Sequence, residues 1–261
     1  MSYKQMTGNI ISATKVEPAG EFQNSAASGV WSLQEQYDYR RGANWPETGN
    51  ALSRGLFFGG ANRPNVIDFV DISTTGNATD FGDLSANSIE GGACSSSTRA
   101  VRGGGTTSAG SGAADSSMET MDYVTIVSTG NATDFGDLTT DRYRGDDGFS
   151  SSTRGIFGGG ANSSDTYLNV IEYITIASTG NGTDFGDLST ATRDIASFCS
   201  TTRGVFAGGQ ASGATDVVEY ITIGSTGNAT DFGDLTAATF VKPGGCSSAT
   251  RGLVGGGLVS A

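Results

Sequence analysis

One short phrase occurs four times in this chain at nearly constant spacing, and it constrains the fold more than any other feature. The copies are STTGNATDFGDL at 73–84, STGNATDFGDL at 128–138, STGNGTDFGDL at 178–188 and STGNATDFGDL at 225–235. Their TGN glycines are separated by 54, 50 and 47 residues. A self-similar period near 50 residues indicates a repeat architecture, which has to be settled before any residue of the phrase is interpreted as catalytic.

Two further patterns recur between the copies, and together they predict four short strands per unit. An Arg-Gly-apolar run that ends in glycines occurs at 54–60, 99–105, 154–160, 203–209 and 251–257. A run rich in β-branched and aromatic residues precedes each TGN triplet, at 66–72, 121–127, 171–177 and 218–224. We name the predicted strands a (Cys/Phe-Ser-Ser-x-Thr), b (the Arg-Gly run), c (the β-branched run) and d (Asp-Phe-Gly-Asp-Leu).

These motifs resemble the kelch repeat over residues 50–261. The glycine pair ends strand b, tyrosine lies in strand c at 123, 173 and 220, and phenylalanine at 81, 135, 185 and 232 stands where kelch repeats usually have tryptophan. Arg193 follows strand d at about the kelch spacing, but the other units lack an arginine there. The resemblance implies an all-β fold, a kelch-like β-propeller of four-stranded blades.

The number of blades depends on how the repeat closes. The c–d pair occurs four times and the a–b pair five times, so one blade lacks a strand pair. We expect N-terminal residues to supply that pair and close a five-bladed ring without free sheet edges. A four-bladed ring, in which the extra pair replaces a weak first blade, and an open fold closed by a neighbouring subunit are the alternatives.

Residues 1–49 are predicted to be a separate segment that anchors or closes the repeat domain of residues 50–261. A capping box at Ser32 and Glu35, with Gly42 after the last turn, predicts one short helix over 33–41. The phrase from Ser28 to Gln36, followed by Trp45-Pro46, resembles a segment of structural proteins in marine tailed bacteriophages, especially tail and fibre proteins. Trp31 and Trp45 either pack this segment onto the repeat domain or anchor it to another virion protein.

Composition excludes several kinds of chemistry. The chain has no histidine, which removes Ser-His-Asp and Cys-His nucleophile systems and makes a zinc site improbable, so no cofactor and no metal are predicted. The formal charge of −12 repels phosphate backbones and argues against nucleic-acid binding. No apolar run is long enough for a membrane span, and the first residues lack a signal-peptide core. Cys94, Cys199 and Cys246 share one repeat position with Phe149, which predicts buried apolar side chains without disulfides.

Carboxylate pairs three residues apart are the residues most suggestive of catalysis, because such pairs suit acid–base hydrolysis or calcium binding. An active site is normally single, however, and the pair occurs in every unit. We therefore interpret it as turn-capping and solvent-facing, with calcium binding in the Asn-Ala-Thr-Asp-Phe-Gly-Asp turns as an alternative. The pairs are Asp80/Asp83, Asp134/Asp137, Asp184/Asp187 and Asp231/Asp234.

Comparison of the copies with one another predicts a binding surface. The a–b and c–d turns barely vary, whereas the b–c and d–a loops vary widely, and in an antiparallel blade these two classes lie on opposite sides. We call them the uniform side and the variable side. Loops on a rigid scaffold commonly carry binding residues. The candidates on the variable side are Arg142, Tyr143, Arg144, Asp146, Asp147, Asp165, Tyr167 and Lys242.

The sequence therefore predicts a non-enzymatic structural or adhesion protein of a phage particle, at a tail fibre, tail tip or capsid spike, assembled in the bacterial cytoplasm. Its expected partners are other virion proteins and a host surface glycan or receptor. Fibre-like proteins are often trimers, so a homo-oligomer is an open expectation. The alternatives are a carbohydrate-active enzyme, with Asp146/Asp147 and Glu90 as weak candidates, and an intracellular kelch-type interaction module.

Overall fold

The computed structural model describes residues 54–60, 65–107, 116–145, 148–240 and 243–259. The chain divides into two units, Met1–Leu52 and Ser53–Ala261. The predicted helix over 33–41 and the tryptophans Trp31 and Trp45 lie outside the described residues.

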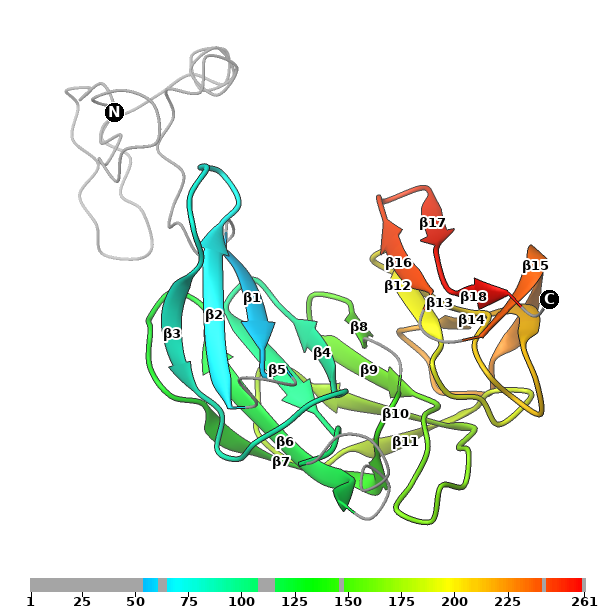
Figure 1. Ribbon diagram of the computed structural model, residues 1–261, viewed down its shortest axis with the longest axis horizontal. Helices are drawn as coiled ribbons and strands as arrows, with labels where there is room; N and C mark the ends of the chain where they lie inside the picture. Colours follow the sequence, from blue (N-terminus) through cyan, green and yellow to red (C-terminus); the bar gives the residue numbers. More distant parts are fainter. Residues whose placement is uncertain (1–53, 61–64, 108–115, 146–147, 241–242, 260–261) are drawn as a thin grey trace, which may run out of the picture. The chain divides into compact units, whose positions relative to one another are not determined.

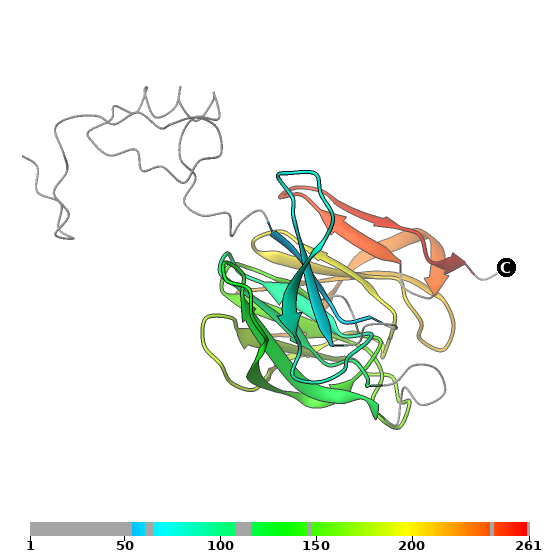
Figure 2. The same ribbon diagram turned by 60° about the vertical axis from the view of Figure 1, so that its left-hand side comes forward.

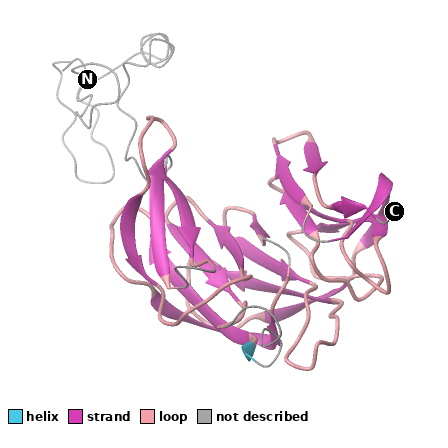
Figure 3. Cartoon of the chain, viewed as in Figure 1, coloured by secondary structure: helices cyan, strands magenta, loops and turns pink. Residues whose placement is uncertain are grey.

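The described residues form small antiparallel sheets and no α-helix; the short cyan piece in Figure 3 is a 3-10 turn at Ser116 (Figures 1 and 3). The first sheet holds β1 (Arg54–Phe58), β2 (Val66–Asp71) and β3 (Thr79–Asp83); the second holds β4 (Gly92–Ser95), β5 (Arg99–Gly103), β6 (Met118–Thr125) and β7 (Thr133–Arg142). The third holds β8 (Phe149–Ser150), β9 (Arg154–Gly158), β10 (Val170–Thr175) and β11 (Thr183–Asp187). The fourth holds β12 (Ala196–Cys199), β13 (Arg203–Ala207), β14 (Thr215–Thr222), β15 (Thr230–Phe240) and β18 (Leu258–Val259), and the fifth holds β16 (Gly244–Ser247) and β17 (Gly252–Gly255).

This arrangement confirms the all-β prediction at the level of several small antiparallel sheets. Strands β1 to β15 pair in sequence order within their sheets, as the a–b–c–d pattern requires, and the pairs can also be followed in the turned view of Figure 2. The exception is β18, which follows the β16–β17 pair in sequence and pairs with β15 of the fourth sheet. The a strands differ in position: β4 begins at Gly92, and the Ser-Ser-x-Thr residues that follow it form the turn into β5. Among the described residues the first sheet has strands b, c and d, whereas the fifth has only a and b.

The repeated phrase joins each of the first three sheets to the next by a contact that we call the clasp. At the first junction, the amides of Gly130 and Ala132 donate to the carbonyls of Phe81 (2.7 Å) and Asp83 (2.8 Å). The Asp83 amide in turn donates to Oδ1 of Asn131 (3.1 Å). The TGN turn of one sheet thus pairs with strand d of the sheet before it, as an added short strand would. The same three bonds recur at the second and third junctions, through Gly180, Asn181 and Gly182, and through Gly227, Asn228 and Ala229.

Strand d needs its glycine because of this clasp. A Cβ at Gly82 would lie 2.4 Å from the Gly130 carbonyl oxygen, and one at Gly186 would lie 2.4 Å from that of Gly227. A register shift next to this glycine leaves the preceding phenylalanine as the extra residue of a β-bulge opposite strand c. Bulges redirect side chains, and here the bulged Phe81 is buried to 2% exposure between two sheets.

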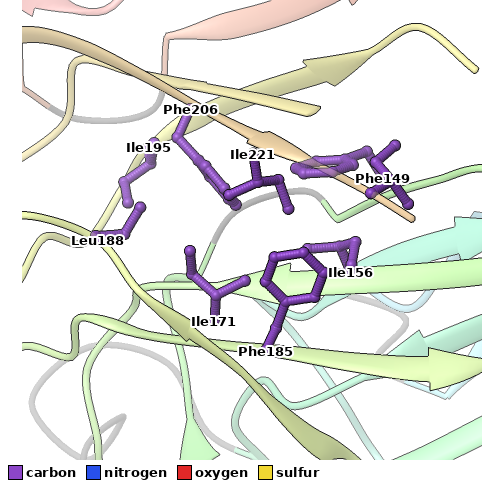
Figure 4. Close-up of a cluster of buried hydrophobic side chains, with 9 residues drawn as sticks. Phe149, Ile156, Ile171, Phe185, Leu188, Ile195, Phe206 and Ile221 are labelled. Atoms are coloured by element: carbon purple, nitrogen blue, oxygen red, sulfur yellow. The ribbon is translucent and has the colours of Figure 1, made fainter. Parts of the chain in front are cut away.

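Apolar cores lie between consecutive sheets. Figure 4 shows the largest, in which Phe149, Ile156, Ile171 and Phe185 of the third sheet meet Phe206 and Ile221 of the fourth. Cys94 is buried in the equivalent core between the second and third sheets, as predicted. The prediction of burial is wrong for Cys199, which is half-buried, and for Cys246, which is exposed. The strand register places Phe198, and not Cys199, at the repeat position of Cys94 and Phe149. Cys246 does hold that position, but no sheet follows the fifth among the described residues to cover it.

Candidate ligand-binding surface on the variable loops

The sheet topology gathers the variable loops on one side of the sheets. Because each sheet is an antiparallel succession of strands, its b–c connection and the d–a connection to the next sheet leave from the same end. Hydrogen bonds join d–a loops of neighbouring junctions directly; the Asp194 amide, for example, donates to the Arg144 carbonyl (3.0 Å). The variable side is therefore a continuous surface built by several repeats.

Three residues with left-handed backbone form a row along this surface. Glu90, Arg144 and Asp194 occupy the same place in successive d–a loops, with φ of 58°, 50° and 55°. Non-glycine residues adopt this conformation at a cost of order 1–3 kcal/mol, and such strain is found preferentially at functional positions. The loop geometry is thus repeated while the residue at this position changes from acid to base to acid. The third of these residues, Asp194, is buried and forms an ion pair with Arg193 at 3.6 Å.

The row is coupled electrostatically. Nε of Arg144 lies 3.2 Å from Oε2 of Glu90, with both side chains about a third exposed. Partial burial of Arg144 disfavours its charged form, but the carboxylates of Glu90 and Asp194 outweigh that effect and raise the pKa of the guanidinium. Arg144 is consequently held between two acids of neighbouring loops.

A second cluster surrounds Arg193. Its Nη1 lies 3.0 Å from Oδ1 of Asp165, its Nε and Nη2 donate to Oε1 of Gln210 (3.2 and 3.1 Å), and its guanidinium stacks over the Tyr167 ring at 4.5 Å. Three different loops supply these four residues. The Asp165 side chain is 58% exposed, whereas that of Arg193 is 13% exposed. The Asp165 carboxylate therefore faces solvent, while the arginine that it pairs with is largely buried.

Tyr143 connects this cluster to the interior. The Tyr143 ring is buried, and its hydroxyl donates to Oδ1 of Asp165. Burial, together with this hydrogen bond and the negative charge of Asp165, raises the pKa of Tyr143 to about 12. The phenol therefore remains a neutral hydrogen-bond donor at physiological pH and fixes the position of the exposed carboxylate.

Arg142 is a correction to the predicted binding set. Its side chain is 4% exposed and forms an ion pair with the fully buried Glu172 of β10, while its Nη1 donates to the Gly159 carbonyl (3.2 Å). Because side chains alternate along β7, the Arg142 side chain points toward the junction between the second and third sheets. It stabilises that junction and has no access to a ligand in solution.

The remaining predicted residues divide into two groups. Tyr143, Arg144, Asp165 and Tyr167 come together on the variable side as described above. Asp146, Asp147 and Lys242 lie outside the described residues, as do the proposed anchors Trp31 and Trp45.

Arg193, Gln210, Glu90 and Asp194 were not predicted as members of this surface. The available signal was positional: Glu90, Arg144 and Asp194 follow strand d at one repeat position and differ in every copy. Comparing residue classes at that position would have found the row, but the contacts of Arg193 with Asp165 and Gln210 link different loops and follow only from the fold.

The repeated aspartates take part in the clasp through their backbone groups and not through their carboxylates. The second aspartate of each pair in the first three sheets gives its backbone amide and carbonyl to the next TGN turn. Within the described parts of the chain, no three His, Cys, Asp or Glu side chains are grouped closely enough to hold a metal ion.

Comparison with known proteins does not assign this chain to a family. No family model matches it, and no curated protein matches its sequence. Among the described residues, no helix has the length and apolar character needed to cross a membrane.

Proposed function

We propose that this chain is a non-enzymatic binding and structural protein of a tailed-phage particle, and that its variable side contacts a host surface glycan or another virion protein. One observation carries the binding part of the proposal. Differences between the repeats are concentrated in the loops of one side, where side chains from several repeats meet in fixed contacts, while the other side keeps nearly the same turns in every repeat. The virion assignment rests on the resemblance of the N-terminal phrase.

We further propose that the sheets are blades of a kelch-like propeller. The support is that three successive junctions share the same clasp and the same kind of apolar core, so each sheet bears a constant relation to the next. A constant relation between small four-stranded sheets is what a propeller repeats around its axis. The sequence favours five blades; a four-bladed ring and an open array closed by a neighbouring subunit are the alternatives.

The chemistry of the variable side fits a hydroxyl-rich ligand. Asp165 and Arg144 offer partly exposed charged groups, and Tyr167 supplies a half-buried ring stacked beneath Arg193. A rigid aromatic surface with a few fixed polar groups suits a polar ligand that also has a nonpolar face. Saccharides have this character. Weak contacts of this kind gain avidity when many copies are displayed on one particle.

Binding by purified protein to host-cell polysaccharides tests the proposal. We expect Asp165→Ala and Tyr167→Ala to weaken binding by about tenfold, equivalent to about 1.4 kcal/mol. Thr129→Ala, an exposed change in a turn of the uniform side, is the matched control and should bind normally. Equal losses in all three variants would reject the variable side as the contact surface.

Two further measurements address the remaining parts of the proposal. Incubation with the same polysaccharides should release no sugar, and release would favour the carbohydrate-active alternative. Labelled antibody against this chain, viewed by electron microscopy on intact particles, should decorate the tail or a capsid spike; undecorated particles would refute the virion role.

A further inference from the structure

The clasp has an acceptor on the fourth sheet that no described residue fills. Strand β15 carries the same Asp-Phe-Gly-Asp sequence as β3, β7 and β11. The phenylalanines of those three strands are 2% exposed, whereas Phe232 of β15 is 57% exposed. A Cβ at Gly233 would meet nothing within 4 Å, although one at Gly82, Gly136 or Gly186 would collide with the next turn.

A cavity of about 340 Å³ lies beside this acceptor. Phe198, Arg203 and Phe232 of the fourth sheet line it together with Arg251 and Gly252 of the fifth. At the earlier junctions, the isoleucine that directly follows strand c of the next sheet fills the corresponding position, as Ile126, Ile176 and Ile223 do at 6%, 0% and 1% exposure.

At this cavity, the arginine of strand b also lacks the carbonyl partner that it has at the earlier junctions. Nη1 of Arg54, Arg99 and Arg154 donates to the carbonyls of those three isoleucines, at 2.7, 2.9 and 2.8 Å. Arg203 is their counterpart in the fourth sheet; it stacks on Tyr220, but no isoleucine carbonyl of a following sheet is present among the described residues. The cavity therefore lacks both an apolar side chain and a carbonyl oxygen.

The first sheet carries the complementary unmatched turn. Gly76, Asn77 and Ala78 have the sequence of the turns that form the three clasps, and no strand d lies before them in the described chain. Ile72, which precedes this turn, is 71% exposed, in contrast to its three buried counterparts. One end of the described repeats thus lacks a clasp acceptor and the other lacks a clasp turn.

The fifth sheet has an open edge at the same place. Among the described residues, strand β17 pairs only with β16, and Leu253 is 68% exposed, whereas its counterparts Val101 and Ile156 are fully buried. In complete sheets, strand c pairs along this edge; Ile156, for instance, lies opposite Tyr173. An unpaired strand edge with exposed apolar side chains is a template for another strand.

We propose that a second copy of this chain binds here head to tail. Its Gly76–Ala78 turn forms the clasp with Phe232–Asp234, its Ile72 enters the cavity, and the Ile72 carbonyl accepts from Arg203. Because β17 and β1 are the same strand of the repeat, the incoming β2 pairs with β17 in place of its own β1. The contact is continuous with the three internal junctions and does not depend on the proposed virion role. Such a heterologous contact leaves one open end on each copy, so chains of more than two copies form.

Thr48–Ala51 is a rival for the acceptor within the same chain, since it also reads Thr-Gly-Asn-Ala. It is preceded by Pro46-Glu47 instead of a β-branched run, and it is followed by Leu52-Ser53 instead of Asp-Phe-Gly-Asp. It therefore lacks the isoleucine that the cavity requires and the strand d that completes a sheet. This difference favours the turn at 76–78.

Light scattering during gel filtration, over a wide range of protein concentration, tests the proposal. We expect the mass of the full chain to rise with concentration from 26.5 kDa toward multiples of that value. Phe232→Asp and Ile72→Asp should each remain monomeric, because each blocks one of the two surfaces. Val127→Asp is the matched control, since Val127 is an apolar residue at 52% exposure outside both surfaces, and it should associate as the unmodified chain does.

Mixing the two blocked variants distinguishes this contact from a symmetric one. Phe232→Asp keeps its turn and Ile72→Asp keeps its acceptor, so an equimolar mixture should form dimers and stop there. A monomeric unmodified chain at every concentration would overturn the proposal, as would a mixture that stays monomeric. A full chain that stays monomeric and associates only after Asn50→Ala is introduced would assign the acceptor to Thr48–Ala51 and would also overturn it.

Discussion

Gly136 and Gly233 allow the energy of one clasp to be measured by a single matched comparison. Both are the glycine of strand d, and both have φ of 135°, so alanine introduces the same backbone strain at each position. At Gly136 the new Cβ would lie 2.6 Å from the Gly180 carbonyl oxygen, whereas at Gly233 it would meet nothing within 4 Å. The difference between the two variants therefore isolates the clasp.

The expected size of the difference follows from the bonds at that junction. Gly136→Ala displaces three hydrogen bonds: Gly180 to Phe135 (2.7 Å), Gly182 to Asp137 (2.7 Å), and Asp137 to the side chain of Asn181 (3.1 Å). At about 0.5–1.5 kcal/mol each, their loss lowers the free energy of unfolding by roughly 1.5–4.5 kcal/mol beyond the shared strain. For a domain of this size that corresponds to a Tm lower by roughly 3–18 °C for Gly136→Ala than for Gly233→Ala.

Thermal unfolding at low protein concentration, where the chain is monomeric, gives the two Tm values. Amide hydrogen exchange gives a local check, because the Gly180 and Gly182 amides are clasp donors and should lose protection only in Gly136→Ala. Equal Tm losses in the two variants, or unchanged protection of these amides, would refute the role assigned to the clasp.

Three other predictions concern burial and charge. Arg142→Met should lower the free energy of unfolding by about 3–5 kcal/mol in chemical denaturation, because it leaves the buried Glu172 carboxylate without its partner, and adding Glu172→Gln should recover part of that loss. Phe135→Ala should cost about 3–5 kcal/mol and Phe232→Ala much less in the monomer, since their exposed fractions are 2% and 57%; similar costs would contradict the burial argument. Because the pKa of Tyr143 is raised to about 12, its contribution to the free energy of unfolding is complete below pH 10 and is lost as pH rises toward 12. Tyr143→Phe should therefore make the free energy of unfolding less dependent on pH across that range. Ultraviolet titration of the variant should show one fewer phenol ionising at high pH.

The strands and their order were predictable because they depend on local patterns that the chain repeats. Arg-Gly runs, β-branched runs and Asp-Phe-Gly-Asp each recur with fixed neighbours. The preference of these residues for strands, and of glycine for the turns that end them, depends on only a few neighbouring residues. The start of strand a was misplaced, because Ser96 uses its hydroxyl to accept from the backbone amides of Thr98 and Arg99 and so forms a turn.

The variable side was predictable only as a location. Alternation of strand direction assigns the loops to one side, but it does not say which side chains point outward. Arg142 and Arg144 are two residues apart and equally polar, yet one is buried in an ion pair while the other is partly exposed beside Glu90. That choice depends on the neighbouring sheet, whose position is not encoded near either arginine.

By itself, the sequence determined that this protein is a tandem array of short antiparallel strands, because periodic spacing and strand propensity act within each unit. Only the tertiary structure showed what the most repeated residues are for. The asparagine and glycine of the TGN turn resemble ordinary turn residues in sequence, but they bind strand d of a different sheet, roughly one repeat away. Hydrogen bonds between sheets are long-range contacts, so their partners, and the clasp positions of the first and fourth sheets that no described residue fills, became visible only when the sheets were placed side by side.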